Sequence, residues 1–127
     1  MKASIIVFCT LILMAIWSCT GQAPKNINSI PPKVFAEKIK LNPKAQLIDV
    51  RTAEEFAGGH LDSAINVNWN STDFEAKASK YDKSKPVFIY CRSGGRSAQA
   101  AAKLSEMGFE QVYDLEGGIA NWNAVGY

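Results

Sequence analysis

Apolar runs typical of buried strands alternate with helix-forming segments from residue 30 to residue 127, and this alternation constrains the fold more than any other feature. Strands that are joined through helices run parallel, and the helices then cover both faces of the sheet. The predicted fold class is therefore α/β, with a central parallel sheet between helical layers. The predicted strands cover residues 46–50, 64–67, 87–90 and 111–115.

Capping residues and glycines mark the helices between these strands. Thr52 and Glu55 have the spacing of a capping box, and Thr72 and Glu75 repeat it. Gly108 ends the strongest helical pattern, because glycine readily adopts the conformation that closes a helix. We expect helices at residues 33–40, from Thr52 to Gly58, from Thr72 to about residue 80, and at 97–107, followed by a short terminal segment with Trp122.

The first residues have the features of an export signal. The run from Ala3 to Trp17 is apolar, and it is shorter than the roughly 20 apolar residues that a membrane span needs. Lys2 precedes this run, and a small residue, Ser18, comes before Cys19. These features favour a secretory signal, with an uncleaved membrane anchor as the alternative.

The end of this run, Ile16-Trp-Ser-Cys19, resembles the lipobox of bacterial lipoproteins, in which the cysteine is lipidated and becomes the mature N-terminus. The resemblance implies a signal peptide at residues 1–18, a lipidated Cys19 with a polar tether up to residue 29, and a single domain at residues 30–127. We therefore expect an exported bacterial lipoprotein, anchored in a membrane and facing the periplasm. A soluble periplasmic protein is the alternative.

The balance of charge counts against nucleic acid as a partner. Without Lys2 the chain carries 13 basic and 12 acidic groups, whereas nucleic-acid-binding domains usually have a strong basic excess. Arg51, Arg92 and Arg96 are the only arginines, and arginine offers a planar fork of donors that suits anions. The sequence has no phosphate-binding loop, dinucleotide fingerprint or cluster of metal ligands, so we expect no cofactor and no metal.

Cys91 is expected to be the one thiol of the mature domain, since Cys9 lies in the leader and Cys19 is the predicted lipidation site. A single thiol excludes a disulfide framework within the domain. A free cysteine is most often a small buried hydrophobe. The residues around Cys91 favour a chemical role over that interpretation.

The segment Cys91-Arg-Ser-Gly-Gly-Arg-Ser97 connects the strongest strand to the strongest helix. Gly94 and Gly95 allow the backbone to curl, also through positive φ, so that successive N–H groups point inward and form an anion-binding nest. The helix N-terminus adds positive potential, and Arg92 and Arg96 add formal charges. Such surroundings lower the pKa of a thiol. The loop therefore predicts a nucleophilic thiolate whose substrate or intermediate is anionic.

The loop CRSGGRS resembles the active-site loop of the rhodanese family of sulfurtransferases. Other motifs typical of that family occur in the same order and spacing, with His60-Leu61 in place of the usual His-Ile. They are Asp49-Val-Arg51, Glu55-Phe56, Gly59-His60-Leu61, Ala64-Ile-Asn-Val67, Leu115-Glu-Gly-Gly-Ile119 and Trp122. The match covers nearly all of residues 30–127. It implies the rhodanese-like three-layer sandwich, with a central parallel sheet and helices on both faces.

The resemblance implies that Cys91 is the catalytic nucleophile. It would attack the outer sulfur of a small anionic donor such as thiosulfate, form a persulfide and release sulfite, and a thiol acceptor would then remove the sulfur. A partner protein can supply that thiol. Arg96 is expected to contact the donor rather than Arg92. The implied substrate- and persulfide-binding residues are Arg92, Ser93, Gly94, Gly95 and Arg96, with Asp49, Arg51 and Ser97 in supporting roles.

Two other functions are kept as alternatives. One is a persulfide carrier or binding module that passes sulfur to a partner protein without turnover. The other, which is weaker, is a cysteine-dependent phosphatase or arsenate reductase. Those enzymes carry a C-x5-R loop, whereas four residues separate Cys91 from Arg96, and the shorter loop suits a terminal sulfur better than a tetrahedral oxyanion.

The remaining polar residues near the predicted site suggest structural roles. We expect Arg51 to pair with Glu55 across the start of the helix, and Asp49 to hydrogen-bond the backbone of the cysteine loop. His60 is the only histidine, which excludes a histidine-rich metal site. A structural contact is favoured for His60 over a role as the base that activates Cys91.

Overall fold

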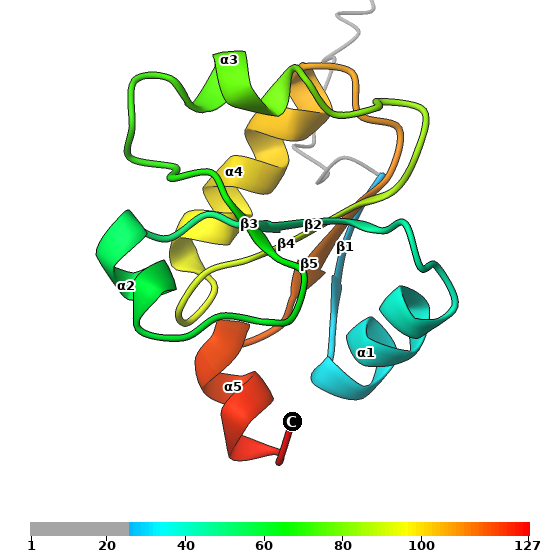
Figure 1. Ribbon diagram of the computed structural model, residues 1–127. Helices are drawn as coiled ribbons and strands as arrows, with labels where there is room; N and C mark the ends of the chain where they lie inside the picture. Colours follow the sequence, from blue (N-terminus) through cyan, green and yellow to red (C-terminus); the bar gives the residue numbers. More distant parts are fainter. Residues whose placement is uncertain (1–25) are drawn as a thin grey trace, which may run out of the picture.

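Five parallel strands form one sheet in the computed structural model, which describes residues 26–127 (Figure 1). The strand order is β1-β5-β4-β2-β3, so that β4 lies at the centre. The predicted α/β class is confirmed, and the four predicted strands agree with the structure to within one residue at each end. The strands are β1 (Ile27–Ile30), β2 (Gln46–Asp49), β3 (Ile65–Asn66), β4 (Val87–Tyr90) and β5 (Val112–Leu115).

Strand β1 was not predicted, because residues 27–29 were assigned to the tether, and the terminal segment with Trp122 was not predicted to be the helix that it forms at Gly118–Ala124. Strand β1 pairs in parallel with β5, and Ile27 lies opposite Val112. Its two central residues are exposed polar side chains at the edge of the sheet, so it has no apolar run to reveal it. The folded domain therefore begins before residue 30. The predicted signal peptide at 1–18, Cys19 and the tether up to residue 25 lie outside the described residues.

The helices confirm one of the two predicted capping boxes. At the first, Thr52 accepts the amide of Glu55 at 3.2 Å and the reciprocal bond is present. The second is wrong, because α3 begins after Asp73, whose carboxylate is bound by the Ser71 hydroxyl, and no side chain caps it. The helices are α1 (Pro32–Lys40), α2 (Ala53–Ala57), α3 (Phe74–Ala78), α4 (Gly95–Glu106) and α5 (Gly118–Ala124).

The two faces of the sheet carry separate hydrophobic clusters. Helices α3 and α4 cover one face, and α1 and α5 cover the other (Figure 1). Successive side chains of a strand point to opposite faces. In β4, Val87 and Ile89 pack on the α4 side, whereas Phe88 and Tyr90 pack on the α1 side. This alternation directs Cys91, the next residue, toward α4. Within residues 26–127 no helix combines the length and the apolar character needed to cross a membrane.

Candidate active site

Cys91 directly follows β4, and the chain then turns into α4 within a few residues. Helix α4 begins at Gly95, which is two residues earlier than predicted, so Arg96 and Ser97 belong to its first turn. Gly94 has a φ of 115°, which is the positive value expected for a curled loop. The positive φ that the glycine pair was expected to allow is thus found at Gly94, whereas Gly95, the first residue of α4, is not among the residues with positive φ.

The start of α5 holds this loop from the other side. The amide of Ile119 donates to the carbonyl oxygen of Cys91 at 2.9 Å, and the amide of Ala120 donates to that of Arg92 at 3.0 Å. Gly118 makes this approach possible, because a Cβ atom at this position would lie 2.5 Å from the carbonyl carbon of Arg92. The closing glycine motif of the sequence therefore shapes the cysteine loop.

The sulfur of Cys91 lies in a ring of hydrogen-bond donors. The amide of Gly94 donates to Sγ at 3.0 Å, and the hydroxyl oxygen of Ser97 lies 3.4 Å from it. Burial raises the pKa of the Cys91 thiol, since only 1% of the residue is exposed, but the hydroxyl of Ser97 and the amides of Ser97, Gly94 and Ser93 outweigh it. The net effect is a lowered pKa, as expected for a nucleophilic thiol.

Arg96 is paired with Glu55, which was expected to pair with Arg51. Its guanidinium donates to both carboxylate oxygens of Glu55, at 2.6 and 2.9 Å. The bond from Arg96, helped by bonds from Thr52, lowers the pKa of Glu55 to about 2 against the effect of burial. The expected contact between Arg96 and the donor stays a prediction.

Arg51 pairs with Asp49 and not with Glu55, which corrects both expectations for this part of the site. The Nη2 atom of Arg51 lies 2.7 Å from Asp49 Oδ2, and its backbone amide donates to Oδ1 at 2.9 Å. Both residues are buried, and Asp49 is bonded to its own strand end and not to the cysteine loop. Burial of this carboxylate requires a close cation, which Arg51, two residues along the chain, provides.

Two other predicted groups lie at the surface. Arg92 is exposed, and none of the ion pairs within residues 26–127 includes it. His60 is also exposed; its Nδ1 atom lies 3.0 Å from the carbonyl oxygen of Phe56, and the two rings stack 3.8 Å apart. These contacts agree with the structural role expected for His60.

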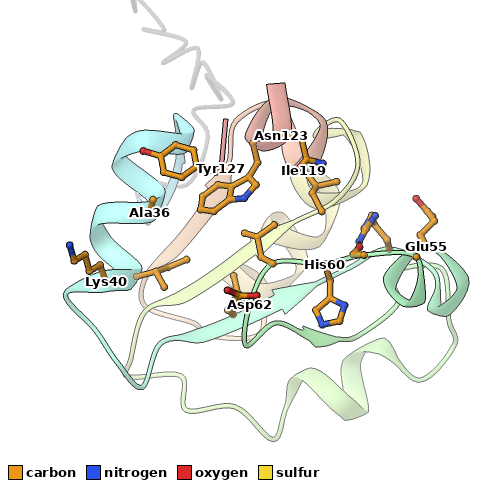
Figure 2. Close-up of a pocket in the computed structure, with 15 residues that line it drawn as sticks. Ala36, Lys40, Glu55, His60, Asp62, Ile119, Asn123 and Tyr127 are labelled. Atoms are coloured by element: carbon orange, nitrogen blue, oxygen red, sulfur yellow. The ribbon is translucent and has the colours of Figure 1, made fainter. Parts of the chain in front are cut away.

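A cleft of about 700 Å³ lies on the side of the sheet that α1 and α5 cover (Figure 2). Ala36 of α1 and Ile119 of α5 line it on one side, and His60 and Asp62 line it on the other (Figure 2). Cys91 is not part of its wall. Ile119 nevertheless joins the cleft to the loop, because its amide binds the Cys91 carbonyl. Glu55 makes a second link through Arg96.

Tyr90 and Asp114 are residues near the site that the sequence analysis did not single out. The hydroxyl oxygen of Tyr90 accepts the amide of Leu61 at 3.0 Å, which ties β4 to the segment before β3. Asp114 is buried in β5, where it lies opposite Ile89 of β4, and its Oδ1 atom has no hydrogen-bond partner. A charged residue within an otherwise apolar strand is the signal that could have revealed Asp114.

Comparison with known proteins identifies related chains. The family model described as Rhodanese-like domain matches residues 32–125. The uncharacterized protein YqhL of Bacillus subtilis is 39% identical over 79 residues, which are 62% of this chain and 61% of YqhL. The chain thus spans less than two thirds of YqhL. Thiosulfate sulfurtransferase GlpE of Pseudomonas savastanoi pv. phaseolicola is 40% identical over 82 residues, or 64% of this chain and 74% of GlpE.

A solved structure is also similar. The crystal structure of a rhodanese-related protein from Thermoplasma volcanium matches with a TM-score of 0.69 and 31% sequence identity. The match covers 79% of this chain and 94% of that chain.

Proposed function

The chain belongs to the rhodanese-like domain family, and we propose that it moves sulfane sulfur from thiosulfate or a related donor to a thiophilic acceptor through a persulfide on Cys91. The observation that carries this proposal is the set of donors around the sulfur, with the Gly94 amide 3.0 Å from Sγ. Donors of this kind favour an anionic sulfur, both as the attacking thiolate and as the persulfide. The relative from Pseudomonas savastanoi is named a thiosulfate sulfurtransferase.

The proposed reaction is a double displacement. The Cys91 thiolate attacks the outer sulfur of thiosulfate, a new S–S bond forms, and the S–S bond of the donor breaks with its electron pair leaving on sulfite. The negative charge then lies on the terminal sulfur of the persulfide, within reach of the amides of the loop. A nucleophilic acceptor attacks that sulfur, and the electron pair of the broken bond returns to Cys91 as thiolate.

Arg92 and Arg96 contribute differently to the recognition of the donor. Arg96 is held by Glu55 at 2.6 Å, so its charge is partly balanced, yet it still acts on the Cys91 sulfur through space. Arg92 is exposed at the mouth of the loop and is free to meet a dianion. We propose that Arg96 sets the potential at the sulfur and contacts the donor, while Arg92 assists its approach.

The acceptor is proposed to be a thiol, either a small molecule or the side chain of a partner protein. We also propose an exported lipoprotein anchored through Cys19, on the basis of the lipobox-like residues 16–19.

Mass spectrometry of the full chain tests the persulfide. Thiosulfate treatment should add one sulfur atom to the peptide that carries Cys91, and cyanide should remove it. Peptide mapping is needed because Cys9 and Cys19 are also present in the chain. The matched control is Cys91→Ser, which should gain no sulfur at this position. A protein that gains no sulfur but hydrolyses an aryl phosphate would support the phosphatase alternative instead.

Steady-state kinetics with thiosulfate and cyanide separate an enzyme from a carrier. Many turnovers per molecule support the sulfurtransferase. A single uptake of sulfur followed by a stall supports a carrier that waits for its partner protein. In both cases Cys91→Ser should abolish the signal.

A further inference from the structure

The chain enters the domain at the end of the sheet that lies opposite the Cys91 loop. All five strands run parallel, so their amino ends share one edge, here called the amino edge, and their carboxyl ends share the other. Cys91 follows the carboxyl end of β4, whereas Asn26 precedes the amino end of β1. The connections α1–β2, α3–β4 and α4–β5 lie at the amino edge, on the right side of Figure 1, and the turn from β4 into α4 lies on the left.

Hydrogen bonds fix the point of entry to the amino edge. The side-chain amide of Asn26 donates to the carbonyl oxygen of Phe109 at 2.8 Å, and its Oδ1 atom accepts the hydroxyl of Ser105 at 2.9 Å. From Cys19 to Asn26 the chain spans at most about 25 Å when fully extended. A small domain is about 30 Å across. An anchor at Cys19 therefore keeps the amino edge closer to a bilayer than the Cys91 loop.

The surface at the amino edge is basic. The connections that form it are residues 41–45, 79–86 and 107–111, and they carry Lys44, Lys80, Lys83 and Lys85 against Asp82 and Glu110. Lys44 and Lys85 line one surface hollow, and the carbonyl oxygen of Lys83 accepts the amide of Glu110 at 3.0 Å. These three lysines are exposed. Of the three, only Lys85 has an ion pair within residues 26–127, a 3.9 Å contact with Asp82.

Leu41 adds an apolar side chain to this surface. It is 85% exposed, the highest value among the exposed large hydrophobic residues of the described part of the chain. It follows the last residue of α1 and precedes the turn that holds Lys44, in which the amide of Ala45 donates to the carbonyl oxygen of Asn42 at 2.9 Å. A single exposed leucine is common on protein surfaces. A leucine beside several lysines, at the edge where a chain anchored through Cys19 would enter, has the composition of surfaces that bind anionic bilayers.

We propose that Leu41, Lys44, Lys83 and Lys85 form a membrane-facing surface that binds anionic phospholipid headgroups. The lysines attract the headgroups, and Leu41 enters the boundary between headgroups and acyl chains. The Cys91 loop, at the opposite edge, then faces away from the lipid. The inference rests on the proposed membrane anchor and deepens the proposed function, because it requires an acceptor thiol that is water-soluble and not embedded in the membrane.

Lysine acetylation of the full chain in lipid vesicles tests the surface. Vesicles of phosphatidylcholine alone are compared with vesicles that also contain phosphatidylglycerol, so that the apolar leader contributes equally to both, and peptide mass spectrometry follows each lysine. Phosphatidylglycerol should slow the acetylation of Lys44, Lys83 and Lys85 by at least about fivefold, the effect of one basic residue at an anionic surface. Lys33, at the start of α1 and thus at the opposite edge, should react equally in both. High salt should remove the protection, because it screens the lysines.

Two variants separate this surface from a general effect of charge. Lys44→Gln should weaken the protection of Lys83 and Lys85 about fivefold. Lys33→Gln is the matched control, because it removes the same charge from an exposed residue at the other edge and should leave the protection unchanged. Leu41→Ser should also weaken the protection, although it changes no charge. Equal losses in Lys44→Gln and Lys33→Gln would overturn the proposal, since the attraction would then follow net charge alone.

Identical acetylation in the two kinds of vesicle would also overturn the proposal. Protection by soluble polyglutamate without protection by vesicles would assign the surface to an acidic protein instead. Lipid on Cys19 is read separately, from the mass of the peptide that carries it in protein purified from cells. An unlipidated Cys19 with protected lysines refutes the lipoprotein and leaves the surface. A lipidated Cys19 with unprotected lysines refutes the surface and leaves the lipoprotein.

Discussion

The guanidinium of Arg96 and the carboxylate of Glu55 form a two-pronged ion pair, with N–O distances of 2.6 and 2.9 Å. Arg96 lies in the first turn of α4, directly after the cysteine loop, and Glu55 lies in α2 beside the cleft. Such paired bonds fix both distance and orientation. The contact therefore ties the helix that follows the Cys91 loop to α2, whose Glu55 lines the neighbouring cleft.

Glu55→Gln is expected to lower stability by about 1 kcal/mol at neutral pH, because a partly exposed ion pair contributes modestly. Glutamine keeps the capping box with Thr52, so the loss of charge is isolated. The pKa of Glu55 is lowered from 4.5 to about 2 in the folded chain, so its contribution is complete above pH 4.5 and is lost as the pH falls toward 2. Urea unfolding at several pH values measures it, with Glu54→Gln as control. A loss that does not depend on pH would contradict the prediction.

Arg96→Lys is expected to reduce thiosulfate turnover roughly tenfold, because lysine replaces a fork of donors by a point charge and loosens the contact with Glu55. Arg92→Lys should have a smaller effect, since it keeps the charge of an exposed side chain. Steady-state kinetics with thiosulfate and cyanide compare the two. A greater loss in Arg92→Lys would show that Arg92, and not Arg96, contacts the donor.

Asp114→Asn is expected to stabilise the protein increasingly as the pH rises. The folded chain keeps the Asp114 proton up to about pH 6, whereas the unfolded chain releases it near its ordinary pKa of 3.8. Stability of the unmodified protein therefore decreases between these values, and the penalty is complete above the upper one. The advantage of the variant should grow by about 3 kcal/mol between pH 3.5 and 7.5. Chemical unfolding at both pH values checks this, and a constant difference would argue against it.

Gly118→Ala is expected to destabilise the fold by at least about 2 kcal/mol. The residue has a φ of 62°, and a Cβ atom there would lie 2.5 Å from the carbonyl group of Arg92. The clash would push α5 away from the cysteine loop, so sulfur uptake should fall as well. Gly95→Ala is the control for stability, because no atom lies within 4 Å of its Cβ position. Thermal unfolding measures both, and equal melting temperatures would refute the role given to Gly118.

Cys19→Ala is expected to prevent attachment of lipid and to leave the protein unprocessed or loosely held. The motivation is the lipobox-like end of the leader, Ile16-Trp-Ser-Cys19. Labelling of cells with a radioactive fatty acid tests it, with the unmodified chain as the positive control. If the unmodified chain carries no label, the lipoprotein proposal is wrong.

Local patterns were sufficient to predict the α/β class, four strands and the position of Cys91 between a strand end and a helix. Strand β4 and the Thr52 capping box are examples, because each depends on residues within one short segment. The place of Cys91 follows from the same logic, since a strand end that leads into a helix N-terminus is visible within ten residues of sequence. Strand β1 was not predicted, because an edge strand with exposed polar residues at its centre has no apolar run in its sequence.

The partners of the charged residues depended on the packing of the whole domain. Glu55 and Arg96 are 41 residues apart in sequence, and they meet only because the strand order places β2 beside β4. Arg51 then pairs with Asp49, because this carboxylate is fully buried at the end of β2 and is costly there without a cation beside it. Asp114 reaches the neighbourhood of Cys91 in the same way, because β5 pairs with β4 and α4 folds back over both. Hydrophobic periodicity acts between near neighbours along the chain, whereas burial and electrostatic pairing are settled by which strands lie side by side.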